Sequence, residues 1–324
     1  MMKRPPSYIS NTKAWLILAL ASLCLICFDE ITSIFFKDMF NSSSYNFVRE
    51  LERTNSNAII LGSSTAARGI DPAVFDAVLG TKTYSFARDG TGIFYATSVL
   101  RNIPKSYKLQ YVIFGIDPAS FVSGFSSSNF RQIERLLPYA IQDDLLRSYL
   151  DQQISWLGIK MLSSSYRYIY VTKEILKDVL RQDTTEQNGF SALDGAMKQK
   201  KLVDKINKTS SHVDINQIAD ESLWALEAMH AEIKERGARL VLVTLPIYND
   251  NLRSRKPENV IVMSKIKASL FDGNLCDLSE LWSSEISSIT RNNKMFYDSA
   301  HLNRDGSKLF TSSFAKNVKA LCLP

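Results

Sequence analysis

The sequence predicts an α/β protein built on a mostly parallel β-sheet. Five short apolar runs have the length and composition of buried strands, at residues 58–61, 83–86, 110–116, 239–245 and 274–278. Patterns typical of helices lie between these runs, so strands and helices alternate along the chain. This alternation favours a parallel sheet with helices on both faces. With 324 residues, 45% of them hydrophobic, the chain can bury such a core without a metal or a disulfide.

The first element along the chain is an uncharged apolar run at residues 14–28. It is shorter than the ~20 residues that cross a bilayer comfortably, and Asp29 and Glu30 separate it from a second apolar stretch, ITSIFF. A cleaved signal peptide, an uncleaved anchor and a buried helix are the alternatives. Cleavage after Ala21 would leave too short a hydrophobic region before it, which favours the uncleaved anchor.

The charges around this run predict its orientation. Lys3, Arg4 and Lys13 precede it, whereas acidic residues follow it. The positive-inside bias then places the N-terminus in the cytoplasm and the remainder outside. We therefore expect a cytoplasmic tip and transmembrane anchor at residues 1–36, a membrane-proximal linker at 37–56 and an α/β domain at 57–324.

Capping residues support the helices between the strands. Asp71 is an N-cap followed by proline at the first helical position, and Gly80 closes that helix. Asn303 is a candidate cap for the last helix. Apolar residues at helical spacing mark two further helices: Leu223, Leu226, Met229 and Ile233, and then Phe310, Phe314, Val318 and Leu321.

A stretch at about 119–217 separates the third and fourth strands and is too long for a crossover connection. Helical spacing occurs near residues 133–137 and 175–180, and no convincing strand is present. We expect an inserted helical subdomain or lid, with a polar, lysine-rich and mobile part at 183–211.

The net charge of +6 is mild. Five lysines cluster in the insertion, at Lys198, Lys200, Lys201, Lys205 and Lys208. A solvated loop is the favoured interpretation, and contact with an acidic polymer or lipid headgroups is the alternative. Zinc-finger spacing and aromatic-basic motifs are absent from the sequence, so no nucleic-acid partner is expected.

The four cysteines fall into two pairs. Cys24 and Cys27 lie inside the apolar run without the strand-helix context of a redox motif, so a packing role is expected. Cys276 and Cys322 are able to pair if the domain is exported, but the sequence leaves this open.

The candidate chemistry rests on one serine, one histidine and one aspartate. Of the three histidines, His212 lies in a polar stretch and His230 in an amphipathic helix. His301 instead follows Asp298 by three residues in a loop-like stretch. Ser64 follows the first apolar run, where a strand delivers a side chain to a sheet edge. A serine, a histidine and an aspartate together perform nucleophilic acyl transfer. The alternative to a catalytic role is that Ser64 caps a helix and that Asp298 and His301 are a surface pair.

These motifs together resemble the SGNH, or GDSL-type, hydrolase superfamily, over residues 57–118 and from 239 to the end. The run Gly62-Ser63-Ser64 resembles the nucleophile block, with Ser63 in place of the usual aspartate, and Asp298-x-x-His301 resembles the last block. We accordingly expect a flavodoxin-like three-layer fold with strand order 2-1-3-4-5. The site should lie at the carboxyl ends of the strands.

The resemblance also implies an oxyanion hole. The run from Ser85 to Gly90 has the spacing of the second block, so the N–H groups of Gly90 and Ser64 would face the oxyanion. Asp117 replaces the asparagine of the third block. An amide donates to an oxyanion, whereas an ionised carboxylate repels it. Losing one donor costs about 10²–10³ in rate, so activity can survive. Arg68 and Arg88 are candidate cationic substitutes for the missing donor and candidate substrate-binding residues; the alternative is that each is a solvated charge.

Residues 62–66 also approach the G-x-S-x-G elbow of α/β-hydrolases. In that fold the acid and the histidine lie on separate loops, and the serine follows a strand deep in the sheet. Here the serine follows the first strand and the acid precedes the histidine by three residues. The SGNH interpretation is therefore favoured.

The wider pattern, an anchor with GSSxxxRGIDP at residues 62–72 and DSAHLN at 298–303, resembles membrane-anchored proteins of bacterial envelopes. These act in alginate O-acetylation and in D-alanyl transfer to teichoic acid. The resemblance implies cofactor-free and metal-free acyl transfer to a cell-surface polysaccharide or other polymer, beside a membrane-bound O-acyltransferase and outside the cytoplasmic membrane. A non-catalytic scaffold that binds such a polymer or partner is the competing function.

Overall fold

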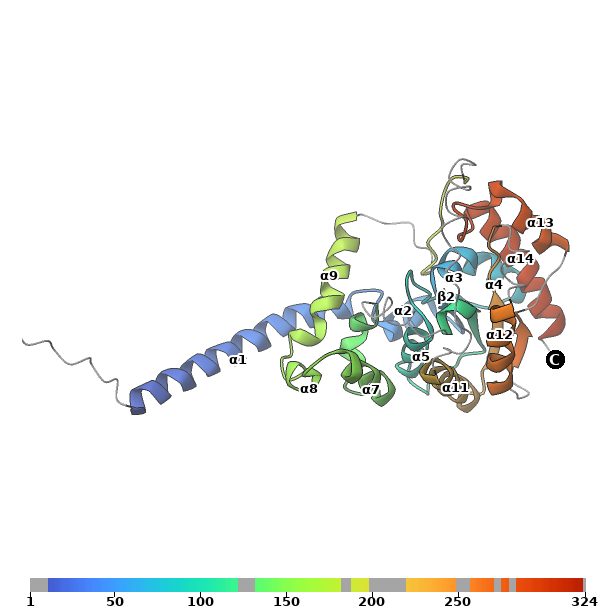
Figure 1. Ribbon diagram of the computed structural model, residues 1–324. Coiled ribbons are helices and arrows are strands. Elements are labelled where there is room, and N and C mark those ends of the chain that lie inside the picture. The colour runs from blue at the N-terminus through green and yellow to red at the C-terminus, as the bar shows by residue number, and fades with distance from the viewer. Residues whose placement is uncertain are drawn as a thin grey trace, which may run out of the picture.

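The structure is a computed structural model that describes residues 11–121, 132–181, 188–197, 220–248, 257–270, 275–279 and 284–322. At its centre lies a five-stranded, all-parallel sheet with the order β2-β1-β3-β4-β5 (Figure 1). The strands are β1 (Ala58–Gly62), β2 (Thr83–Ser85), β3 (Tyr111–Ile116), β4 (Arg239–Thr244) and β5 (Leu275–Leu278). The predicted α/β fold and strand order are confirmed.

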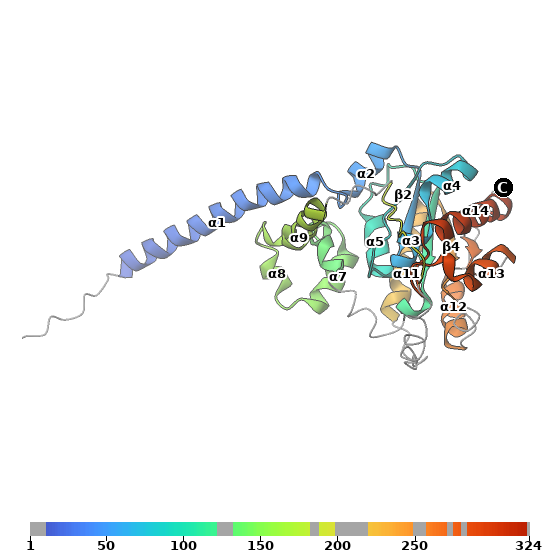
Figure 2. The same ribbon diagram turned by 90° about the horizontal axis from the view of Figure 1, so that it is seen from above.

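Side chains that alternate along the strands build a separate core on each face of the sheet. Ile59 and Leu61 of β1 face one core, and Ala58 and Ile60 face the other. Figure 2 shows the sheet between the two helical layers. The first core is covered by α5 (Ile93–Arg101), α11 (Asp220–Glu235) and α12 (Pro257–Ser269), and the second by α3 (Ser64–Gly69), α4 (Pro72–Leu79), α13 (Ser284–Arg291) and α14 (Arg304–Leu321).

The predicted caps begin and end the helices where expected. The Asp71 carboxylate accepts a hydrogen bond from Ala73 N at 2.9 Å, and Gly80 ends α4 with a φ of 72°. Asn303 caps α14 by accepting from Gly306 N at 3.0 Å. These contacts satisfy backbone groups that a helix leaves without partners at its ends.

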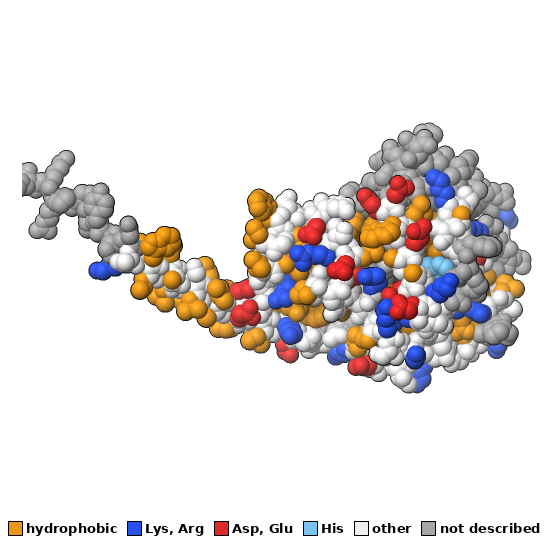
Figure 3. Space-filling view, turned by 90° about the horizontal axis from the view of Figure 1, so that it is seen from below, with side chains coloured by type: hydrophobic (Ala, Val, Ile, Leu, Met, Phe, Trp, Pro, Cys, Tyr) orange, Lys and Arg blue, Asp and Glu red, His pale blue; other side chains and the backbone are white. Residues whose placement is uncertain are grey.

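The first helix, α1 (Asn11–Asn41), projects from the domain as a rod (Figure 1). Its residues Thr12–Asn41 are long and apolar enough to cross a membrane, and none of the most apolar window is buried. A buried core helix is thereby excluded, which leaves a single membrane anchor or a signal sequence. Hydrophobic side chains cover much of the rod in Figure 3, and acidic side chains appear where it meets the body. Cys24 and Cys27 are exposed on this helix, so the packing role expected for them is not seen.

Residues 37–56, expected as a linker, are instead packed into the domain. The short helix α2 (Phe47–Thr54) places Phe47 between two aromatic rings, with centroid distances of 5.2 Å to Phe86 and 4.8 Å to Tyr139. Phe40, near the end of α1, is buried in the same core. The rod is therefore joined to the domain through a folded segment.

The insertion is helical over most of its described residues. It contains η1 (Pro118–Phe121), η2 (Glu134–Tyr139), α7 (Asp144–Gln153), α8 (Leu157–Lys160) and α9 (Tyr166–Arg181). Helix α9 packs against both η2 and α1. The insertion therefore contacts the N-terminal rod as well as the domain.

One part of the insertion differs from expectation. Residues 188–197, part of the stretch expected to be mobile, form an irregular segment that we call the strap, and it lies against the domain. Ser85 N donates to Asn188 O at 2.9 Å, and Phe190 and Met197 are buried. The lysine cluster at 198–208 and His212 lie outside the described residues.

A disulfide joins Cys276 of β5 to Cys322 at the end of α14, with 5.6 Å between their Cα atoms. The pairing that the sequence left open is therefore present. It ties the edge strand to the last helix, across the second core.

Candidate active site

The site forms where the direction of strand addition reverses. From β1 the chain moves to β2 on one side and then returns to β3 on the other. Gly62, the last residue of β1, pairs with Gly115 of β3, so Ser64 and Asp117 follow at the same edge. In open α/β sheets, ligands bind at such a reversal, at the carboxyl ends of the strands.

Gly62 makes the turn from β1 into α3 possible. Its φ is +140°, and a Cβ on it would lie 2.7 Å from Gly115 O and 2.8 Å from Ala66 Cβ. A larger residue would therefore be both strained and overpacked. Ser63 follows as the N-cap position of α3, with its hydroxyl 3.1 Å from Thr65 Oγ1, and Ser64 opens the helix.

A tight backbone loop positions His301. Phe296 and Leu302 form an isolated antiparallel bridge, and Tyr297 N donates to His301 O at 2.9 Å. Beyond β4, Tyr248 N donates to Ser299 O at 3.1 Å and ties the loop to the sheet. The loop thus delivers His301 to the edge where β1 ends.

Ser64, His301 and Asp298 form a continuous hydrogen-bonded chain. His301 Nε2 lies 2.8 Å from Ser64 Oγ, and His301 Nδ1 lies 3.0 Å from each oxygen of the Asp298 carboxylate. The side chains of His301 and Asp298 are 24% and 38% exposed, so molecules from solution can reach the group. A hydroxyl, an imidazole and a carboxylate are thus within hydrogen-bond reach, which is the set of groups that nucleophilic acyl transfer uses.

The electrostatics of Asp298 suit an orienting role. Partial burial raises the pKa of its carboxyl group, but hydrogen bonds from the His301 side chain and the Ala300 backbone N–H outweigh that effect. The net pKa lies below the ordinary 3.8, so Asp298 is ionised at neutral pH. An ionised carboxylate favours the proton on Nδ1, which leaves Nε2 free to accept the serine proton.

The structure brings Gly90 and Asp117 to the same edge. Arg88 N and Thr91 Oγ1 both donate to Gly62 O, at 3.2 and 2.8 Å, so the loop around Gly90 is fixed beside the end of β1. Asp117 directly follows β3, and its backbone carbonyl accepts from Ser120 N at 2.9 Å. Both residues therefore lie at the edge where β1 and β3 end, and their role at an oxyanion stays a prediction.

The two candidate arginines bind groups within the protein. Arg68 pairs with Asp89 at 2.7 Å and donates to the strap at Ser191 O at 2.9 Å and to its hydroxyl. The guanidinium of Arg88 lies 4.5 Å above the Tyr45 ring and donates to Ser44 Oγ at 2.8 Å. Their role in binding substrate stays a prediction.

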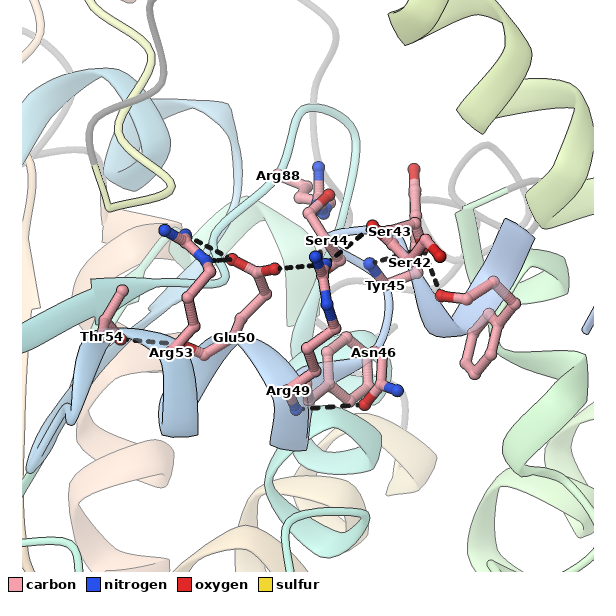
Figure 4. Close-up of polar contacts among 12 residues, drawn as sticks. Ser42, Ser43, Ser44, Tyr45, Asn46, Arg49, Glu50, Arg53, Thr54 and Arg88 are labelled. Carbon is pink, nitrogen blue, oxygen red and sulfur yellow. Dashed lines mark hydrogen bonds and ion pairs between the residues drawn. The ribbon is translucent and has the colours of Figure 1, made fainter. Parts of the chain in front are cut away.

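Figure 4 shows Arg88 beside Ser44, close to the segment that follows the rod. In the same view the Glu50 carboxylate lies between Arg49 and Arg53, at 3.0 and 2.6 Å. Since Arg88 belongs to the loop that carries Gly90, these contacts connect the site directly to the segment that follows the rod.

The sequence did not predict that the strap lies at the edge of the candidate site. Asn303 Nδ2 donates to Gly195 O at 2.8 Å, and Arg304 N donates to Leu193 O at 2.8 Å. Because α3 holds the strap through Arg68, the strap is bound on both the serine and the histidine side. The one sequence signal for this contact was Gly189, which has a φ of +75° and no space for a side chain beside Ser85 O.

Comparison with known proteins does not identify a family for this chain. No protein-family model matches the chain, and no curated protein matches it in sequence. What stands is an α/β protein with a five-stranded all-parallel sheet and an apolar N-terminal helix. The functional argument therefore rests on the geometry of the site.

Proposed function

We propose that this protein is a membrane-anchored, extracytoplasmic serine acyltransferase or esterase of the SGNH type. The observation that carries the proposal is the chain of hydrogen bonds from Ser64 through His301 to Asp298, at 2.8 and 3.0 Å. Its location at the β1–β3 reversal supports the same conclusion. The decisive experiment asks whether an activated ester leaves its acyl group on Ser64.

The geometry supports a two-step reaction. His301 Nε2 accepts the hydroxyl proton as Ser64 Oγ attacks the acyl carbonyl, and ionised Asp298 stabilises the imidazolium. Ser64 begins a helix, so its N–H has no intrahelical acceptor and can donate to the oxyanion together with Gly90 N–H. The leaving alcohol takes the proton from His301 as the tetrahedral intermediate collapses. The acyl group then passes to a sugar hydroxyl or to water by the same steps in reverse.

The proposed class of acyl acceptor is taken from the resemblance to bacterial envelope proteins. A cell-surface polysaccharide or another polymer is the proposed acyl acceptor, with a membrane-bound O-acyltransferase as a further partner. No cofactor is needed, because the serine itself carries the acyl group. The rod supplies the proposed single-pass anchor in a bacterial cytoplasmic membrane, and the disulfide supports export, since disulfides persist outside the cytoplasm.

The orientation of the anchor is testable with a reporter enzyme that is active only outside the cytoplasm. Fused after Leu321, the reporter should be active, because the basic residues before α1 hold the N-terminus inside. A matched fusion after Lys13 should be inactive. An inactive Leu321 fusion, or release of a soluble protein cleaved after Ala21, would contradict the proposal.

In the proposed mechanism, Asp117 stands at a position that would need a hydrogen-bond donor to the oxyanion. We expect Asp117→Asn to raise ester turnover by up to about 10²-fold, because a neutral amide donor replaces a carboxylate. Asp117→Leu, which removes the charge without adding a donor, is the matched control and should give a smaller gain. A lower rate in Asp117→Asn with an unchanged melting temperature would show that the carboxylate has a role of its own.

The second candidate function is a non-catalytic scaffold that binds a polymer or a membrane-bound acyltransferase. The observation that favours it is Asp117, a carboxylate at a position where the resemblance calls for an oxyanion donor. A scaffold would have no need for an aligned serine and imidazole, so the two functions differ in whether an acyl-enzyme forms.

A further inference from the structure

We propose that the corner between α8 and α9, residues 156–165, enters the outer leaflet of the bilayer beside the rod. The ligand of this surface is the lipid bilayer itself. The inference rests on the proposed role of α1 as an anchor, and it adds a second contact with the membrane. Three observations carry it: the length of the apolar part of α1, the hydrogen bonds to Asp29, and the side chains that the corner exposes.

The first observation is that the apolar part of α1 before Asp29 is too short to cross the bilayer core. A bilayer core about 30 Å thick needs about 20 helical residues, and counting from Ala14 this reaches Ser33 or Ile34. Glu30, which follows Asp29, is exposed and accepts from Ser164 Oγ, and the exposed side chains beyond it, Ile31, Ile34 and Phe35, are apolar. Lys37 and Asp38 are the next exposed charged residues and mark the outer boundary. Asp29 therefore lies below that boundary if α1 crosses the membrane.

The second observation is that the corner satisfies Asp29. Its carboxylate accepts from Ser163 Oγ at 2.7 Å, Ser164 N at 2.7 Å and Ser165 N at 3.1 Å. Glu30 accepts from Ser164 Oγ at 2.9 Å. A carboxylate at that depth is costly unless it is hydrogen-bonded, so these donors suit immersion. The same bonds hold the corner at the depth of Asp29.

The third observation is the set of apolar side chains on the corner. Trp156, Ile159 and Leu162 are 75%, 61% and 81% exposed. Leu162 directly precedes the serine turn that binds Asp29. Trp156 has a φ of 62°, an uncommon conformation for a bulky residue, and here no packing of its side chain compensates for it. Tryptophan is enriched where membranes meet water.

The arrangement of the helices agrees with these observations. Figures 1 and 2 both show α8 on the side of the domain from which the rod projects. Lys160 of α8 is exposed between Ile159 and Leu162, where it can meet anionic headgroups. The rod and the corner thus form two contacts with one bilayer, which fixes the tilt of the domain over the membrane.

The test uses the full chain in liposomes that contain lipids with brominated acyl chains, which quench nearby tryptophans. Three single-tryptophan variants retain Trp15 in the rod, Trp156 in the corner or Trp224 on α11, with every other tryptophan changed to phenylalanine. We expect Trp15 and Trp156 to be quenched and Trp224, half-exposed on the domain, to be unaffected. For Trp156, bromine near the headgroup end of the chain should quench more than bromine near the methyl end.

A second pair of variants tests the corner without removing its tryptophan. In the Trp156 variant, Leu162→Glu should reduce the quenching at least about twofold, since a charge in the leaflet is costly. The matched control, Leu321→Glu, changes a leucine that is exposed at the far end of α14 and should leave the quenching unchanged. Both positions are exposed, so neither change disturbs the core.

The outcomes separate this inference from the proposed anchor. Quenching of Trp15 without quenching of Trp156 would overturn the inference and leave the anchor standing. This is also the result expected if the corner binds a membrane protein, because the liposomes hold this chain alone. Quenching of neither residue would overturn both. Quenching of Trp156 that is insensitive to Leu162→Glu would also contradict insertion of the corner.

Discussion

Ser64→Ala and His301→Ala are each expected to lower the turnover of an activated ester by roughly 10⁴–10⁶-fold, and the double variant should be little worse. The serine oxygen and the imidazole nitrogen are 2.8 Å apart and act in one proton transfer, so removal of either group leaves the other without a function. The measurement is the steady-state rate for each variant, with a thermal melt to verify folding.

Two matched variants make this prediction specific. Ser63→Ala removes the neighbouring hydroxyl, which lies against Thr65 rather than the imidazole, and should retain most of the activity. Asp298→Asn should lose less than His301→Ala, because it spoils the orientation and charge while the base remains. Full activity in both Ser64→Ala and His301→Ala would remove serine catalysis and favour the scaffold.

The second large effect is expected at Gly62. Replacement by alanine should lower the free energy of unfolding by about 3 kcal/mol or more, because it combines backbone strain with overpacking. A Cβ would lie 2.7 Å from the Gly115 carbonyl of the adjacent strand and 2.8 Å from Ala66 Cβ. Neither neighbour is the end of a flexible side chain. Activity should fall as well, since Ser64 is positioned by the same turn.

Gly80 provides the matched control for this effect. It also has a positive φ, +72°, but a Cβ there meets nothing within 4 Å. Gly80→Ala should therefore cost only about 1 kcal/mol, which is the backbone term alone. Denaturant unfolding of both variants measures the difference. Equal losses at the two positions would show that the close packing of Gly62 against Gly115 contributes nothing.

The fold and the three residues of the candidate site could be picked out from sequence because their signals are local. The central strands β1, β3 and β4 are mostly apolar runs, and Gly80 and Asn303 are caps that act on their own helices. Asp298 and His301 lie within one turn of chain. Only the pairing of His301 with Ser64, 237 residues away, needed the strand order as an intermediate step.

Contacts between distant segments explain what the sequence did not predict. Phe47 is a single aromatic residue in a short helix, and it joins the core through rings from distant segments, Phe86 and Tyr139. Arg88 was identified as a candidate cation for substrate, but its contact with Tyr45 depends on where the segment after the rod folds. The same applies to the bond between Asp29 and Ser163, which are 134 residues apart.

The strap illustrates a further limit. Half of its residues are apolar, among them the buried Phe190 and Met197, but no periodic pattern marks it as ordered. Its order comes from partners elsewhere, namely Ser85 at the edge of the sheet, Arg68 of α3, and Asn303 and Arg304 at the start of α14. A single-sequence pattern contains no trace of such partners apart from the glycine that must lie close to another backbone.

The most direct test of the central claim, that Ser64 carries an acyl group, is intact-mass spectrometry of the full chain after incubation with an activated acetyl ester and acid quenching. The wild-type protein is expected to gain the mass of one acetyl group, and peptide mapping should place it on Ser64. Ser64→Ala should gain nothing, and Ser63→Ala should react like the wild type. A wild-type protein that gains no mass, or an equal gain in Ser64→Ala, would contradict the account.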